Sequence, residues 1–392
     1  MDKIDELLTR GVDKIYPSRD ALEKVLRSGK KLRLYQGFDP TGTLLHIGHM
    51  TGLRKLRQWQ DLGHHVIFLI GDGTGQAGDP SGKTRGREKY LTNEQLRQNA
   101  RDYVLQAKKV VRFDGDNPVE ILYNGDWLNK LSLVDLLDIA GHFSLQQLEE
   151  REMFVERKKK GEPINLREFL YPLLQGYDSV AMKVDLELGG SDQTFNMLCG
   201  RTLVRNYLAK EKFVMTTPLL TDNQGKKIGK TEGNVIALNS PPKELYGLIM
   251  SLSDDVIVKA FEYITDLPLE EVKEIEKKIS RGDNPMVYKK KLALTLTAML
   301  NSQKEAAEAE SYFEQAFQKR ETPEEIPIVK LDQNINIVDF LVQQKLAGSR
   351  GEAKRLIEAN AIELDGKIIS KVNEVVKPGI MKVGKRRFLR LI

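Results

Sequence analysis

The first part of the chain alternates short apolar segments with amphipathic ones. Residues 32–36 and 66–70 have the length and apolar character of buried strands, and residues 46–62 between them repeat apolar side chains at helical spacing. Two strands joined through a helix predict a parallel βαβ unit. The helix is expected to bury Ile47, Met50, Leu53, Leu56 and Trp59 on one face and to direct Arg54, Lys55, Arg57 and Gln58 mostly outward.

The alternation continues through the next hundred residues. Residues 93–111 are predicted to form a helix and residues 119–123 another strand. Helices are expected beyond residue 131, interrupted at 156–163 by a basic segment that Gly and Pro mark as a loop. The pattern indicates an α/β fold with a Rossmann-like parallel sheet.

The second half of the chain has a different pattern. From residue 241 to about 318 it is helical, and the Glu- and Pro-rich segment 321–327 has the composition of a linker. The last module is expected to hold helices at 337–344 and 349–359 and strands at 362–364 and 382–383. The predicted domains are a Rossmann-like domain over 1–231 with a helical insertion at about 125–190, an α-helical domain over 232–320, a linker over 321–333 and a small α+β domain over 334–392.

Composition narrows the class of protein. The 392 residues are 40% hydrophobic and 30% charged, and no apolar run approaches the roughly 20 residues that cross a bilayer. The acidic start of the chain resembles neither a signal peptide nor a transit peptide, so a soluble cytoplasmic protein is expected. The single cysteine, Cys199, excludes an internal disulfide and is expected to pack in the core. His64 and His65 have no companions at ligand spacing, so no structural metal is expected.

Positive charge is concentrated at the end of the chain. Residues 334–392 contain twelve basic and six acidic side chains, a net charge of +6, whereas the whole chain carries +5 and the remainder therefore −1. A near-neutral body with a basic terminal module indicates an enzyme that holds a polyanionic nucleic acid through an appended domain.

Two short motifs carry candidate chemistry. His46-Ile47-Gly48-His49 stands where the strand at 32–36 has turned and a helix begins, a position that directs backbone donors and two imidazoles at a nucleotide triphosphate. Lys226-Lys227-Ile228-Gly229-Lys230-Thr231 reads as a mobile loop with amines that can neutralise a leaving pyrophosphate. Taken alone, the second motif is also typical of a surface turn.

Together these motifs resemble those of the class I aminoacyl-tRNA synthetases. His46–His49 matches their HIGH motif, and Lys227–Thr231, KIGKT, resembles their KMSKS loop. The segments 34–41, 78–83, 171–178 and 189–193 resemble the bacterial tyrosyl-tRNA synthetases, and the terminal module resembles the S-four-type RNA-binding domain often fused to them. Two departures are KIGKT itself, which keeps both lysines, and Gln36, which stands where some relatives have a cysteine.

The resemblance implies a tyrosine–tRNA ligase that forms tyrosyl-adenylate from ATP and then charges tRNA(Tyr). It implies that Tyr35 and Asp178 bind the phenol hydroxyl of L-tyrosine. The remaining implied tyrosine-binding residues are Asp79, Tyr171, Gln175 and Gln193. A carboxylate that accepts from a buried phenol leaves an unpaired group if phenylalanine enters, so no editing domain is required.

The resemblance also assigns residues to ATP, with Mg²⁺, and to the reaction. The implied ATP-binding residues are Gln36, Gly37, Asp39, Thr41, Gly48, Gly190 and Asp192. The implied catalytic residues, which stabilise charge on the phosphates, are His46, His49, Lys227, Lys230, Thr231, Lys83 and Arg87. The implied tRNA-binding residues are Arg350, Lys354, Arg355, Lys385 and Arg386. The resemblance further implies a homodimer, with helices between about 131 and 168 at the interface.

Three other classes of protein share part of this pattern. Nucleotidyltransferases use an HxGH motif at the same kind of turn but usually lack the RNA module. A tryptophanyl-tRNA synthetase shares the fold, although the pair Tyr35 and Asp178 favours tyrosine. A non-catalytic RNA-binding relative is expected to lose motif residues, whereas both histidines and both lysines are present here.

Overall fold

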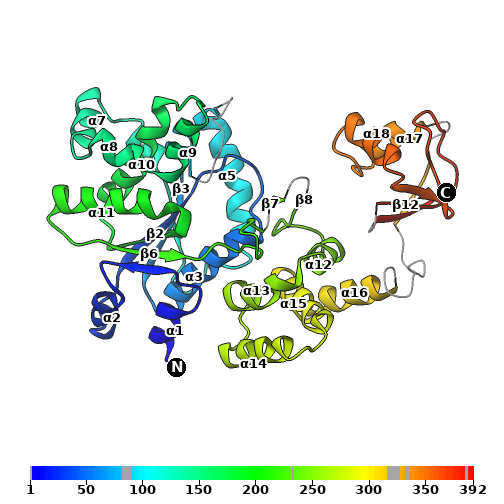
Figure 1. Cartoon of the computed structure of the whole chain (residues 1–392), viewed down its shortest axis with the longest axis horizontal. Helices are drawn as coiled ribbons and strands as arrows, with labels where there is room; N and C mark the ends of the chain where they lie inside the picture. Colours follow the sequence, from blue (N-terminus) through cyan, green and yellow to red (C-terminus); the bar gives the residue numbers. More distant parts are fainter. Residues whose placement is uncertain are drawn as a thin grey trace. The chain divides into compact units, whose positions relative to one another are not determined.

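Figure 1 shows the computed structural model of the chain, which describes residues 2–81, 90–228, 230–231, 234–315, 327–331, 335–384 and 387–392. The chain divides into two compact units. The first comprises Met1–Ser240 and Ile249–Gln303, and the second comprises Pro241–Leu248 and Lys304–Ile392. Each unit contains a sheet of its own.

A six-stranded sheet forms the centre of the first unit. Its strand order is β1-β6-β5-β2-β3-β4, and each neighbouring pair is parallel except β1 with β6. The strands are β1 (Lys14–Tyr16), β2 (Arg33–Phe38), β3 (His65–Ile70), β4 (Glu120–Tyr123), β5 (Leu186–Gly190) and β6 (Phe213–Thr217). The three predicted strands are β2, β3 and β4, so the βαβ unit and the parallel sheet are confirmed. Their carboxyl ends lie along one edge, where α/β folds bind ligands.

Helices pack around this sheet (Figure 1). The longer ones are α3 (Met50–Asp61), α5 (Asn93–Ala107), α10 (Leu166–Ala181) and α11 (Thr194–Leu208). The shorter ones are α1 (Lys3–Thr9), α2 (Arg19–Arg27), α4 (Thr74–Ala77), α6 (Gly125–Leu128), α7 (Leu133–Ala140), α8 (Leu145–Glu149) and α9 (Glu152–Lys159). Helices α10 and α11 approach each other closely, since a Cβ on Gly176 would lie 3.0 Å from the backbone nitrogen of Gly200.

Two predictions for these helices are wrong. Arg54 and Lys55 of α3 are buried, because Arg54 donates to the carbonyl of Tyr263 and Lys55 donates to the carbonyls of Leu7 and Arg10. The helix therefore contacts neighbours on the face that its sequence marks as polar.

The basic segment predicted as a loop is largely helical. Helix α9 continues through Lys159, and the loop is confined to the residues that follow. Arg157 of this helix forms a buried ion pair with Glu168 of α10 at 2.6 Å. The basic residues of this segment therefore do not all face solvent, because Arg157 anchors the helix.

The described residues between 241 and 315 form helices and no strand, as the pattern predicts. These helices are α12 (Pro242–Met250), α13 (Ile257–Ile264), α14 (Leu269–Ser280), α15 (Pro285–Leu300) and α16 (Gln303–Phe313). No helix in the described ranges is long and apolar enough to cross a membrane.

The terminal module of the second unit is a small α+β structure. Its helices are α17 (Ile337–Gln343) and α18 (Arg350–Glu358), and its sheet has the order β11-β10-β12-β13-β9. The strands are β9 (Ile328–Val329), β10 (Ile362–Leu364), β11 (Lys367–Ile368), β12 (Gly379–Val383) and β13 (Arg387–Leu391). Both predicted helices and both predicted strands are confirmed, whereas β9, β11 and β13 were not predicted. Phe340, Ile357 and Met381 belong to one buried core of this module.

Candidate functional site

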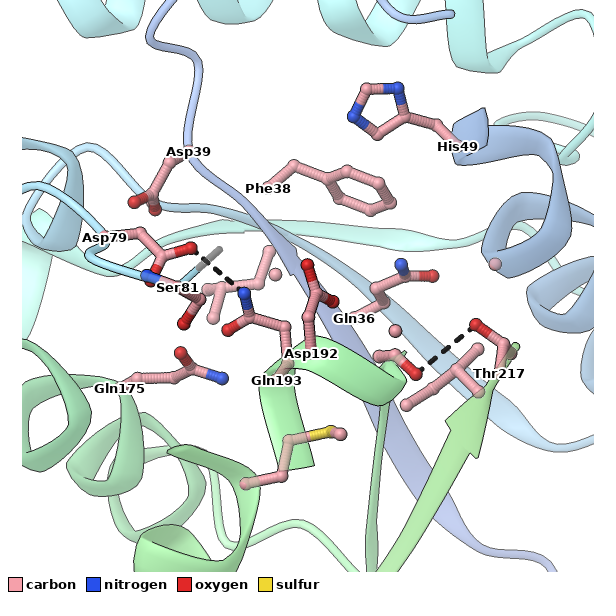
Figure 2. A pocket seen from close by; sticks show the side chains of 18 of the residues that line it. Gln36, Phe38, Asp39, His49, Asp79, Ser81, Gln175, Asp192, Gln193 and Thr217 are labelled. Carbon is pink, nitrogen blue, oxygen red and sulfur yellow. Dashed lines mark hydrogen bonds between the residues drawn. The ribbon is translucent and has the colours of Figure 1, made fainter. Parts of the chain in front are cut away.

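A pocket of about 480 Å³ opens at the carboxyl edge of the parallel strands in the first unit. Strands β2, β5 and β6, helix α10 and the turns after β2 and β3 contribute its walls (Figure 2). Sixteen of the predicted site residues line it: Tyr35, Gln36, Gly37, Asp39, Thr41, His46, Gly48, His49, Asp79, Tyr171, Gln175, Asp178, Gly190, Asp192, Gln193 and Lys227. The fold thus brings together residues from segments far apart in the sequence.

The other predicted site residues are not among the described residues that line this pocket. Lys83, Arg87, Lys385 and Arg386 lie outside the described residues. The backbone of Lys230 and Thr231 forms β7, paired with β8 (Asn234–Val235), but their side chains lie outside the described part of the chain. Arg350, Lys354 and Arg355 belong to α18 in the second unit.

The Asp178 carboxylate is buried at one end of the pocket. Its two oxygens accept hydrogen bonds from the indole Nε1 of Trp127 at 2.8 Å and the amide of Asn124 at 3.0 Å. Burial raises the pKa of Asp178, and the two hydrogen bonds act in the opposite direction because they favour the ionised form. Tyr35, also buried, places its hydroxyl 3.0 Å from Ser179 Oγ.

Sequence reasoning did not assign roles to Asn124, Trp127 or Ser179. Asn124 and Trp127 follow β4 directly, so their place at the carboxyl end of a predicted parallel strand was an available signal. Ser179 follows Asp178 within a helix and carries no signal of its own.

Amide and carboxylate groups surround a second region of the pocket. Asp79 accepts from the Gln193 side chain at 2.9 Å and from the backbone amide of Ser81 at 2.8 Å (Figure 2). The amide of Asn196 donates to Gln193 at 2.8 Å and to Gln175 at 3.1 Å. This region therefore presents oxygen acceptors.

Asp39 is held by two hydroxyl donors. Tyr171 donates to it at 2.9 Å and Thr74 at 2.7 Å. A Cβ on Gly71 would lie 1.9 Å from the Asp39 carboxylate, so a glycine is required at that turn. Gly71, which directly follows β3, thus leaves the space that the Asp39 carboxylate occupies.

The two histidines of the HIGH-like motif stabilise the turn in which they lie by accepting hydrogen bonds from its backbone. Nδ1 of His46 accepts from the amide of Gly48 at 3.2 Å, and Nδ1 of His49 accepts from the amide of His46 at 3.1 Å. The sequence predicted that the backbone amides of this turn donate to a bound anion. For the amides of His46 and Gly48 this prediction is wrong, because they donate to the two histidine rings. Each neutral ring then carries its proton on Nε2. A Cβ on Gly48 would lie 3.0 Å from the His46 ring and 3.1 Å from the carbonyl of Ile228.

The KIGKT segment reaches the same pocket through Lys227. Its ammonium forms an ion pair with Asp192 at 2.7 Å. The Gln36 side chain, which also lines the pocket, lies over Gly52, where a Cβ would come within 2.5 Å of the Gln36 amide. The Gln36 Oε1 atom is buried without a hydrogen-bond partner among the described residues.

Comparison with known proteins identifies relatives over the whole length of the chain. The model of the class I tRNA synthetases (W and Y) matches residues 27–318, and that of the tyrosine–tRNA ligase SYY-like C-terminal domain matches residues 318–389. The tyrosine–tRNA ligase of Thermotoga maritima is 40% identical over 98% of this chain and 96% of its own. That of Dehalococcoides mccartyi strain CBDB1 is 40% identical over 100% and 99%.

Solved structures of tyrosyl-tRNA synthetases have the same fold. A C-terminally truncated mitochondrial enzyme from Aspergillus nidulans aligns with a TM-score of 0.67 and 25% identity, over 80% of this chain and 94% of that one. An enzyme from Archaeoglobus fulgidus, complexed with L-tyrosine, aligns with a TM-score of 0.63 and 20% identity, over 79% and 98%. The chain therefore belongs to the class I aminoacyl-tRNA synthetases for tryptophan and tyrosine, and within them to the tyrosine–tRNA ligases.

Proposed function

We propose that the pocket binds L-tyrosine with its phenol hydroxyl between Tyr35 and Asp178. Asp178 carries this proposal, because a buried carboxylate held by Asn124 and Trp127 is a fixed acceptor for one hydroxyl proton. Phenylalanine would leave these buried groups unpaired, and tyrosyl-tRNA synthetases are the standard example of such rejection. L-tyrosine is also the ligand of the archaeal relative.

The acceptor-rich region of the pocket suits the other end of the amino acid. Asp79, Tyr171 and Gln175 bind the ammonium group, and Gln193 donates to the carboxylate. Asp79 and Gln193 already form one hydrogen-bonded pair, so an acceptor for the ammonium group and a donor for the carboxylate lie side by side. Fixed polar groups of this kind orient the substrate without reorganisation.

As a tyrosine–tRNA ligase the protein activates tyrosine with ATP and transfers it to tRNA. In the first step a carboxylate oxygen of tyrosine bonds to the α-phosphorus of ATP as the bond to the bridging oxygen breaks and pyrophosphate leaves. In the second, a hydroxyl of the tRNA 3′-terminal ribose attacks the adenylate carbonyl and AMP leaves. The protein supplies alignment and charge stabilisation, and no residue is acylated.

The phosphate-binding groups belong to three segments. His46 and His49 donate from Nε2 to the phosphates, and Lys227 and Lys230, with Thr231, hold the pyrophosphate. Lys83 and Arg87 act on the same group. ATP enters as its Mg²⁺ complex, and Asp192 and Gly190 bind its ribose. The remaining contacts with ATP are made by Gln36, Gly37, Asp39, Thr41 and Gly48. Lys227 must then exchange Asp192 for phosphate oxygens as ATP binds, because the two are paired in the structure.

The terminal module binds tRNA(Tyr) in this proposal. Arg350, Lys354 and Arg355 lie on one short helix, and Lys354 and Arg355 are exposed. With Lys385 and Arg386 they supply positive charge for phosphates, which dominate nucleic-acid affinity. We assign catalysis to residues 1–231, an anticodon-region role to 232–320 and RNA binding to 334–392, and place the protein in the cytoplasm.

A homodimer is the oligomer that the surface supports. Helix α7 exposes Leu133, Val134 and Leu137, whose exposed fractions are 72%, 75% and 62%, and Leu145 and Leu166 are exposed nearby in sequence. Apolar residues gathered in this way mark protein interfaces. Sedimentation equilibrium should give twice the chain mass for the wild type and one chain mass for Leu137→Asp.

Amino-acid-dependent exchange of labelled pyrophosphate into ATP tests the proposed site. Tyrosine should support exchange, tryptophan and phenylalanine should not, and Asp178→Ala should abolish the tyrosine signal. Exchange driven by tryptophan would contradict the assignment of the pocket. Retained tyrosine exchange in Asp178→Ala would place the phenol elsewhere.

A further inference from the structure

A buried ion pair lies behind the tyrosine end of the pocket. Lys212, just before β6, pairs with Glu187 of β5, and their side chains are 0% and 2% exposed. The Lys212 ammonium also donates to Ser179 Oγ at 2.7 Å and to the carbonyl of Met197 at 3.2 Å. Burying two charges is costly even when they are paired. Neither residue has a role in the reaction described above.

The fold provides a place for this ammonium group. A Cβ on Gly200 of α11 would lie 2.5 Å from Lys212 Nζ, so the absence of a side chain there leaves the necessary space. Tyr35 and Glu187 are register partners in the sheet, which places their side chains next to each other on the same face. Ser179 of α10 contacts both of them.

The chemistry of Lys212 sets the direction of its own hydrogen bonds. An ammonium group can only donate, so Ser179 Oγ accepts from it. The Ser179 hydroxyl donates to Glu187 Oε2, a charged acceptor, at 3.3 Å. The Tyr35 oxygen lies 3.0 Å from Ser179 Oγ, so Ser179 joins the ion pair to the Tyr35 hydroxyl.

We propose that the buried Lys212–Glu187 pair is a positioning element for tyrosine recognition, which acts through Ser179 to fix the place of the Tyr35 hydroxyl beside the phenol oxygen of the substrate. The inference rests on the proposed function, in which Tyr35 and Asp178 bind the phenol. Asp178 accepts the one proton of the phenol, and the Tyr35 hydroxyl, held by Ser179, completes the polar contacts around the phenol oxygen.

The same carboxylate reaches the ammonium end of the site. Glu187 Oε1 accepts from the Gln175 amide nitrogen at 2.9 Å. This contact fixes which end of the amide is oxygen, and that oxygen accepts from Asn196 with a second lone pair for the substrate ammonium. Glu187 therefore connects both ends of the tyrosine-binding region.

Ser179→Ala gives the sharpest test, because it removes the hydroxyl that joins the ion pair to Tyr35 and leaves the ion pair itself in place. In pyrophosphate exchange, KM for tyrosine should rise about 3- to 10-fold with kcat nearly unchanged, as expected for one lost hydrogen bond. The preference for tyrosine over phenylalanine should fall by a similar factor. In a Tyr35→Phe background the same substitution should have no further effect on KM, since the hydroxyl through which it acts is gone.

Two more variants separate positioning from folding. Lys212→Met combined with Glu187→Gln removes both charges without leaving one unpaired, and should raise KM for tyrosine at least as much as Ser179→Ala. Lys210→Met is the matched control, because its ion pair with Asp185 lies nearer the surface, and it should leave this KM unchanged. Circular dichroism should show folded protein for each.

The outcomes distinguish this inference from the proposed function. If Tyr35→Phe leaves KM for tyrosine unchanged, the placement of the phenol is wrong. If Tyr35→Phe raises KM but Ser179→Ala does not, or adds its full effect to that of Tyr35→Phe, the positioning role is overturned and the ion pair is structural.

Discussion

Asp178 depends on the two nitrogen donors that hold its carboxylate in a buried position. Trp127→Phe removes the indole donor at 2.8 Å and leaves a ring of similar character. The pKa of Asp178, already raised by burial, should rise further, and KM for tyrosine should increase about tenfold, because a hydrogen bond to a charged group contributes about 1.5–3 kcal/mol. Steady-state pyrophosphate exchange measures this effect.

Trp59→Phe provides the control for that experiment. Trp59 is fully buried in α3, and its Nε1 has no hydrogen-bond partner among the described residues. The substitution should lower stability slightly and leave KM for tyrosine unchanged. An equal change in KM for both variants would show that indole volume, not the Asp178 contact, is responsible.

His64 makes the stability of the fold depend on pH. Its Nδ1 accepts from the backbone amide of Leu32 at 3.0 Å, and burial lowers the pKa of His64 to about 4. As pH falls from about 6.5 to about 4, the unfolded chain takes up a proton that the folded chain does not. The free energy of unfolding should therefore fall by about 3 kcal/mol over this range from His64 alone.

Urea unfolding at a series of pH values tests the contribution of His64. His64→Asn keeps an acceptor that does not titrate, so it should flatten the dependence between pH 6.5 and pH 4. His65→Asn is the matched control, because that side chain is 50% exposed. A wild-type slope that persists in His64→Asn would assign the pH dependence to other groups.

At the scale of single elements, the loop that carries Lys227 is expected to act on the rate of activation. Lys227→Met removes a cation from the region proposed to hold the leaving pyrophosphate, and losing one such group costs on the order of 10²-fold in kcat. KM for tyrosine should stay unchanged, since Lys227 pairs with Asp192 and not with the groups proposed to bind tyrosine. Pre-steady-state formation of tyrosyl-adenylate measures the step directly.

Lys226→Met is the neighbouring control for the loop. Lys226 is exposed and does not line the pocket, so its substitution should change kcat by less than twofold. A comparable loss in both variants would mean that total loop charge matters and that Lys227 has no particular position.

The sequence predicts elements better than it predicts buried polar contacts. Periodicity locates β2, α3 and β3 because each buries an apolar face that its own residues reveal. Lys55 and Lys212 are different, since nothing in the neighbouring sequence separates Lys212 from the more exposed Lys210. Both are buried because they have partners distant in the chain: Lys55 donates to the carbonyl of Leu7, and Lys212 pairs with Glu187. The resemblance to the synthetase family predicted the residues that line the pocket, but it did not predict the buried residues that hold them, such as Ser179 and Lys212.

At the scale of the whole molecule, a basic terminal module implies that the two reactions respond differently to its charge. Arg350, Lys354 and Arg355 replaced together by Gln should leave pyrophosphate exchange unchanged, because the described residues that line the pocket belong to the first unit. Aminoacylation should show a raised KM for tRNA with kcat little affected. The log–log dependence of tRNA affinity on salt should become shallower by about 1 for each phosphate contact removed.

The salt dependence of tRNA affinity distinguishes two explanations of a raised KM for tRNA. A variant with a destabilised module would bind tRNA less well at every salt concentration and keep the wild-type slope. Loss of phosphate contacts lowers the slope itself, because fewer counterions are released on binding. Lys304→Gln, an exposed substitution on α16, should change neither quantity. If the triple variant keeps both slope and KM, tRNA is held by other surfaces and the charge at the end of the chain serves another purpose.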